Sequence, residues 1–196
     1  MKVSIKKYAL YACCGIFAVF LCYAFIKNRE LTAKHDRIKQ SISANHEVIL
    51  LVENENSGLS VADREVYWLK DSLAKTDLSA FNSPDKVYFC FSLHVCPPCI
   101  DTTIDLLKQF AGYATNENLV VLSPDLPVRL RNDYYGKQVL MMEPNTPGLP
   151  VDDIHIPYFF QLDSELKTRS VHVVDKLDFK RTEAYIKSTI QIQTNR

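Results

Sequence analysis

The sequence predicts an α/β protein carried on one N-terminal transmembrane helix. Three features indicate this class: an uncharged apolar segment near the N-terminus, an alternation of strand-like and helix-like segments, and two strand-like runs followed by a last helix. The 196 residues suffice for one hydrophobic core and an appendage. Lysine plus arginine number 23, as do aspartate plus glutamate, so no overall basic charge favours nucleic acid as a partner.

The apolar segment runs from Tyr8 to Ile26 without a charged residue. As a helix it would be about 28 Å long, close to the hydrocarbon thickness of a bilayer. Three lysines precede it, as in a secretory signal, but no small-residue cleavage site follows. We therefore expect an uncleaved anchor, with cleavage and lipidation at Cys13 or Cys22 as the less favoured alternatives.

The side of the membrane follows less directly from the sequence. More positive charges follow the apolar segment than precede it, which by the positive-inside rule places the rest of the chain in the cytoplasm. Long domains, however, translocate largely regardless of such charges. We expect export, with the domain on the periplasmic side of a bacterial inner membrane.

The chain divides into four parts: a short tail (1–7), the transmembrane anchor (8–26), a polar helical stalk (27–44) and a globular domain (45–196). Apolar periodicity and turn residues predict the elements of the domain. We expect strands at 48–52, 86–92, 118–123, 137–142, 154–163 and 169–174, helices at 60–73, 100–111, 126–135 and 177–192, and a proline-rich loop at 143–153.

The motif Cys96-Pro97-Pro98-Cys99 lies at a strand-to-helix turn. Before it, KVYFCFS is a continuous apolar run typical of a central strand that is covered on both faces. After it, one helical face carries Ile100, Ile104, Leu107 and Ala111. The body of the chain has one more cysteine, Cys90, and three cysteines are too few for a disulfide framework.

Position on the helix assigns roles to the two cysteines of the motif. A thiol at a helix N-terminus is stabilised as a thiolate by the dipole and by unpaired N–H groups, so we expect Cys96 to be the nucleophile. Cys99, three residues on, is then the more buried resolving thiol. Pro98 suits a first helical turn because its missing N–H would be unpaired there. Cys90, among aromatic residues of the strand, is expected to be inert packing.

The order of strand, CPPC, helix, strand, helix, proline-led hairpin and helix resembles the thioredoxin fold. With the anchored start and the downstream IPYFFQLD, the chain is similar to the TlpA and ResA-like membrane-anchored thiol-disulfide oxidoreductases over residues 45–196. The resemblance implies a central mixed sheet flanked by helices and a redox-active disulfide Cys96–Cys99 with no other cofactor or metal. It further implies a cis Pro157 beside that pair, protein thiols or disulfides as substrates, and a membrane thiol as electron donor.

The sequence departs from this family at three positions. Val95 stands where a tryptophan is common, Cys90 where thioredoxin has a buried aspartate, and Thr102 where ResA-like proteins have a glutamate. The proton acceptor for the second cysteine is therefore open, with four carboxylates as candidates: Asp101, Glu143, Asp152 and Asp153. His94 is a candidate for stabilising the thiolate.

Two other functions stay open at this point. A copper metallochaperone on a thioredoxin fold would use the two cysteines and a distal histidine as ligands. A degenerate domain would bind partners without catalysis. The direction of electron flow is also open, although the resemblance favours a reductant.

Overall fold

The computed structural model describes residues 2–61, 64–68, 75–92, 97–124, 133–142, 149–154 and 156–190. They belong to two compact units, residues 1–46 and 47–196. Helix α1 extends over Lys2–Glu55, so its last residues belong to the second unit. Within the described residues, no helix is both long and apolar enough to cross a membrane. The transmembrane anchor at residues 8–26 therefore remains a prediction.

The second unit is built on one mixed sheet with the strand order β2-β1-β6-β4-β3-β7-β8, and β5 pairs with β6 outside this path. Strands β3, β4 and β6 run parallel, whereas β7 is antiparallel to both β3 and β8. The strands are β1 (Glu65–Trp68), β2 (Thr76–Asp77), β3 (Val87–Cys90), β4 (Leu119–Ser123), β5 (Asp133–Tyr134), β6 (Lys137–Met142), β7 (Tyr158–Leu162) and β8 (Thr168–Val173).

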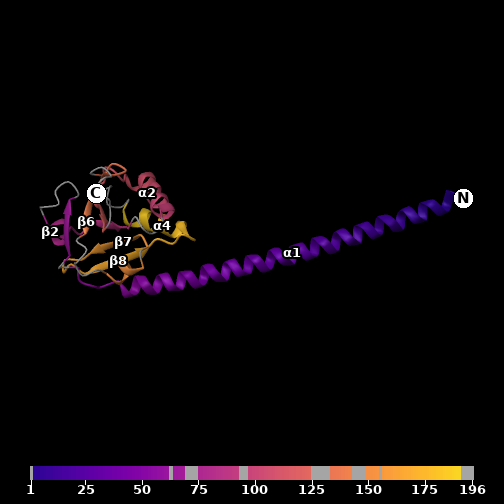
Figure 1. The fold of residues 1–196 in the computed structure, drawn as a ribbon, viewed down its shortest axis with the longest axis horizontal. Helices are drawn as coiled ribbons and strands as arrows, with labels where there is room; N and C mark the ends of the chain where they lie inside the picture. The colour runs from indigo at the N-terminus through magenta and orange to yellow at the C-terminus, as the bar shows by residue number, and fades with distance from the viewer. Residues whose placement is uncertain are drawn as a thin grey trace. The chain divides into compact units, whose positions relative to one another are not determined.

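Helices cover both faces of this sheet. On one face, α2 (Pro97–Ala111) packs against α4 (Phe179–Thr189), and the two lie on the same side of β7 and β8 (Figure 1). On the other face lie the end of α1, the 3-10 turn η1 (Leu78–Phe81) and the short helix α3 (Pro150–Asp153). All four residues of β3 are buried, as the apolar run predicts for a doubly covered strand.

The predicted thioredoxin-like arrangement is confirmed in the second unit. Strand β3, helix α2 and the parallel strand β4 form the expected crossover, and the hairpin β7–β8 followed by α4 completes the order. The predicted strand at 137–142 is β6. The last helix begins where Asp178 caps it by accepting a hydrogen bond from the backbone N–H of Arg181 at 3.4 Å.

The strand predicted at residues 48–52 is wrong, because these residues form the last turns of α1. A short apolar run does not by itself distinguish a strand from a buried helical segment. Here the run continues the polar helix before it, and Ile49 and Glu53, four residues apart, both face the domain core and are buried. Asn56 then ends the helix, accepting a hydrogen bond from the Val151 N–H at 2.9 Å through its side chain.

The helix predicted at residues 60–73 is also wrong, since residues 65–68 form strand β1. This strand pairs with both β2 and β6, so tertiary pairing overrides the weak helical periodicity. Trp68 is half-buried and packs edge-on against Phe81, as expected for boundary packing. The helix predicted at 126–135 is wrong for its last residues, which form strand β5 and the turn after it, and its earlier residues lie outside the described part. Pro150–Asp153, predicted as loop, is helical, and residues 143–148 lie outside the described part.

Candidate redox site at the start of helix α2

Helix α2 begins at Pro97, directly inside the CPPC motif. Pro97 and Pro98 are exposed, and Cys99 is 4% exposed on the buried side of the helix. Cys99 is disulfide-bonded, whereas Cys22 and Cys90 keep their thiols. Its carbonyl accepts a hydrogen bond from the Thr103 hydroxyl at 2.7 Å. The expected burial of the second cysteine is thus observed. Cys96 lies outside the described residues, so its pairing with Cys99 and its role as nucleophile remain predictions.

The sheet explains why the motif and Pro157 come to the same edge. Strand β3 ends just before the motif, and its last residue, Cys90, pairs with Tyr158, the first residue of the antiparallel strand β7. Pro157 therefore lies beside Phe91, beyond the carboxyl end of β3, where α2 also begins. The Pro157 carbonyl accepts a hydrogen bond from the Val174 N–H at 2.9 Å, which holds this proline in the sheet.

The prediction of a cis peptide bond before Pro157 is wrong. Both Ile156 and Pro157 are described, and the described part of the chain contains no cis peptide bond. The trans form of an X–Pro bond is favoured by about 0.5–1 kcal/mol. The resemblance of this chain to a family with a cis proline does not by itself overcome that preference. Pro157 is nevertheless buried at the expected edge.

Apolar side chains surround Cys99. It belongs to the core cluster between the sheet and helices α2 and α4, which includes Phe91, Ile100 and Phe159. A charge on a sulfur in such surroundings is poorly solvated, so Cys99 must take up a proton when the disulfide is reduced and release one when it forms again.

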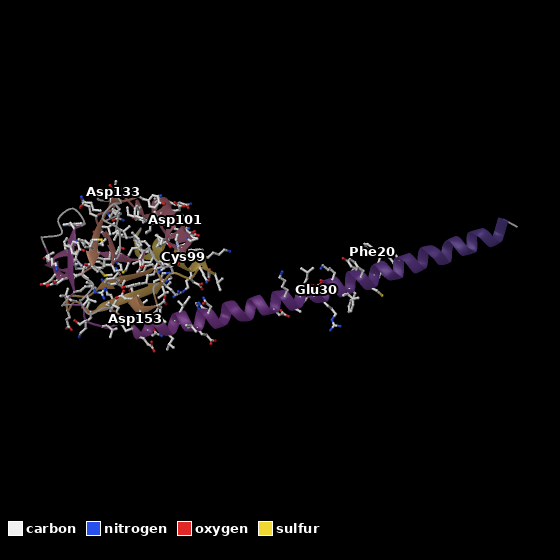
Figure 2. All side chains as sticks on the ribbon, viewed as in Figure 1. Phe20, Glu30, Cys99, Asp101, Asp133 and Asp153 are labelled. Atoms are coloured by element: carbon white, nitrogen blue, oxygen red, sulfur yellow. The ribbon has the colours of Figure 1, made fainter. Side chains whose placement is uncertain are left out.

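Two of the proposed proton acceptors lie on the wrong face of the sheet. Asp152 is held by the Arg64 guanidinium at 3.0 Å and by the Tyr158 hydroxyl at 2.6 Å, on the side of α3. Asp153 also belongs to α3 and lies far from Cys99 in the domain (Figure 2). Glu143, like His94, lies outside the described residues. Asp101, two residues after Cys99 on α2, is exposed on the other side of the helix, so none of the candidate carboxylates that the structure describes lies beside Cys99.

A buried ionic cluster on the other face was not predicted. Arg64 is 2% exposed and donates to Asp152 and, at 3.3 Å, to the sulfur of Met142. Burial alone would lower the pKa of Arg64, but Tyr158, Asp152 and Cys90 close by raise it above its usual value. Burial has the opposite effect on Tyr158, whose pKa it raises. No sequence pattern marks Arg64, because its partners come from residues far along the chain.

No protein-family model and no curated protein matches the chain in sequence. Solved structures that match include a secreted thiol-disulfide isomerase from Corynebacterium glutamicum, 14% identical, which covers 71% of this chain and 91% of its own, with a TM-score of 0.41. BsSco, a member of the Sco family of cytochrome c oxidase assembly proteins, is 14% identical and covers 70% of this chain and 95% of its own, with a TM-score of 0.41. The mitochondrial 2-Cys peroxiredoxin of Plasmodium falciparum is 16% identical, and the match covers 69% of this chain and 96% of the peroxiredoxin, with a TM-score of 0.38.

The strand order, the crossover through α2 and the start of α2 at Pro97 are those of a thioredoxin-like fold.

Proposed function

We propose that the protein is a membrane-anchored thiol-disulfide oxidoreductase that reduces disulfides of other proteins through Cys96 and Cys99. The observation that carries this proposal is the place of Cys99: disulfide-bonded, buried, and at the start of a helix that follows a central strand. Pro157 at the same sheet edge supports it.

The reaction proceeds in two exchanges. The Cys96 thiolate attacks one sulfur of the substrate disulfide, the S–S bond breaks, and the other substrate sulfur leaves as a thiolate that takes up a proton. Cys99, after losing its proton, attacks the Cys96 sulfur of the mixed disulfide and releases the second substrate thiol. Two electrons and two protons pass to the substrate, and the Cys96–Cys99 disulfide forms. A membrane thiol carrier then reduces that disulfide.

The reduction potential of the Cys96–Cys99 pair tests the direction of electron flow. For a reductant we expect a potential near that of thioredoxin, about −270 mV, or below it. Equilibration of the purified chain in dithiothreitol or glutathione buffers, followed by thiol alkylation, measures it. Cys90→Ala is the control, since Cys90 lies outside the motif and its loss should leave the potential unchanged. A potential above about −200 mV would indicate an oxidant or an isomerase instead.

We place the domain on the extracytoplasmic side of a bacterial inner membrane, anchored by residues 8–26. The uncharged segment Tyr8 to Ile26 supports the anchor, although the charge count opposes the orientation. An alkaline phosphatase fusion at the C-terminus should be active in a bacterial host, because that enzyme requires export to form its disulfides. A matched fusion to a reporter that works only in the cytoplasm should be inactive, and the reverse pattern would refute the orientation.

A further inference from the structure

Tyr135 occupies a backbone conformation that tyrosine rarely adopts. It forms with Gly136 the two-residue turn between β5 and β6, and φ is 51° at Tyr135 and 85° at Gly136. Positive φ at both positions marks a type I′ turn, for which Asn-Gly is strongly preferred. A residue such as tyrosine is strained there by about 1 kcal/mol or more. Folding alone would favour asparagine at this position.

Three contacts fix the Tyr135 ring in one orientation. Its hydroxyl donates to the Asp101 carboxylate at 3.2 Å, and the Lys108 ammonium lies 4.3 Å from the ring centroid. The Tyr134 ring meets it edge-on, with centroids 4.9 Å apart. Asp101 raises the pKa of the Tyr135 hydroxyl, which therefore stays protonated and donates. The side chain is nevertheless 54% exposed, so a rigid aromatic surface faces solvent.

This aromatic surface adjoins the redox motif. Asp101, which holds the hydroxyl, follows Pro97 and Pro98 by one helical turn and shares their exposed helix face. Tyr134 packs on Phe91, the residue that follows β3, with ring centroids 5.1 Å apart. Asp101, Asp133 and Cys99 lie in the same part of the domain (Figure 2).

Among the residues that the structure describes around the ring, acidic side chains outnumber basic ones. Asp101 and Asp105 are exposed on α2, and Asp133 is half-exposed at the start of the turn. Lys108 is the cation that contacts the ring, and it pairs with Asp105 at 3.4 Å. A positively charged group brought next to the ring would therefore meet the carboxylates of Asp101 and Asp133 as well as an aromatic face.

We infer that Tyr135 is a specificity-determining residue that binds the polypeptide segment next to the target disulfide and favours a lysine or arginine in that segment. This inference rests on the proposed function, because the position of the ring matters only if substrates reach the CPPC motif. The aromatic ring supplies contact area at low entropic cost, and the carboxylates around it select the cation.

The test compares the wild-type chain with Tyr135→Asn on three probes. These are a short peptide disulfide with lysine beside the cysteine, the same peptide with glutamate there, and hydroxyethyl disulfide. For the wild type we expect kcat/KM for the lysine peptide to exceed that for the glutamate peptide about tenfold, equivalent to about 1.4 kcal/mol. Tyr135→Asn should reduce this ratio to about two or less through a higher KM for the lysine peptide.

Asparagine is suited to positive φ, so the variant should unfold at the same temperature as the wild type or a higher one. Ser170→Asn is the matched control: Ser170 is also exposed at positive φ, 51°, but lies in β8, and its replacement should keep the preference. Tyr135→Phe keeps the ring and should retain most of the preference.

An unchanged ratio in a folded Tyr135→Asn variant would overturn the inference. So would a wild-type chain that reduces hydroxyethyl disulfide but shows no preference between the peptides, and in that case the proposed function would stand. A wild-type chain that reduces none of the probes would overturn both.

Discussion

Replacing Cys96 with serine should abolish disulfide reduction, whereas replacing Cys99 should leave a protein that attacks once and stops. In the proposed reaction, the variant without Cys96 lacks the thiolate that opens the substrate disulfide. Without Cys99 nothing resolves the mixed disulfide, so the protein accumulates covalently joined to its substrate. We expect turnover to fall at least about a thousandfold in both variants, as for loss of other catalytic nucleophiles. Non-reducing gels and mass spectrometry distinguish the two variants, because only the Cys99 variant should carry covalently bound substrate.

The same pair of variants separates the redox function from copper transport. In a copper carrier both sulfurs are ligands, so either replacement should weaken metal binding to a similar degree, and neither should trap a protein. Alkylation at limiting reagent gives a second measurement: if Cys96 is the nucleophile, it should react at a lower pH than the buried Cys99. Equal and slow alkylation of both cysteines would refute the assignment of Cys96 as nucleophile.

The sequence predicts best where one local signal suffices. The segment 87–91 before the CPPC motif is apolar at every position, and β3 is buried on both faces. The apolar face of α2 repeats at helical spacing, and its members Ile100, Ile104 and Leu107 are fully buried. The first strand of the hairpin, β7, is likewise almost wholly apolar and buried, whereas β8, with the sequence TRSVHV, is a mixed strand that carries only two apolar residues.

Prediction fails where tertiary contacts decide the conformation. Residues 48–52 are helical because Glu53 accepts hydrogen bonds from the Val173 N–H at 2.7 Å and from Arg181, partners more than a hundred residues away. Strand β1 exists because β6 and β2 pair with it. The hairpin turn at Tyr135 and Gly136 was missed, because residues 126–135 were predicted to be helical and Tyr-Gly is an uncommon sequence for such a turn. The contacts of Tyr135 with α2 depend on residues distant in sequence, so no local pattern indicates them.

His172 should make the domain markedly less stable in mild acid. The ring is 3% exposed, its Nε2 lies 3.1 Å from the Thr182 hydroxyl, and it stacks on Tyr185 with centroids 4.5 Å apart. Burial, with a smaller effect from the positive charge of Arg181, lowers the pKa of His172 to about 3. The ring is therefore neutral at pH 7, and its Nδ1, 3.5 Å from Glu53, forms no ion pair there.

The direction of the pH effect on stability follows from the difference in proton binding between the folded and the unfolded state. Histidine in an unfolded chain titrates near pH 6.5, so below that pH the unfolded state binds a proton that the folded state excludes until about pH 3. The free energy of unfolding should fall by up to about 1.4 kcal/mol per pH unit across this window, and by about 5 kcal/mol in total. Above pH 6.5 both states are neutral and the effect vanishes.

Urea unfolding of the purified chain at several pH values between 7 and 4.5 tests this prediction. His172→Gln should be less stable than the wild type at pH 7, because it loses the stacking on Tyr185. Its stability should then decline less steeply, by about 2 kcal/mol less than the wild type between pH 6.5 and pH 5. His46→Gln, at a partly exposed position of α1, should follow the wild-type curve. Parallel curves for the wild type and His172→Gln would show that the buried ring does not control acid stability.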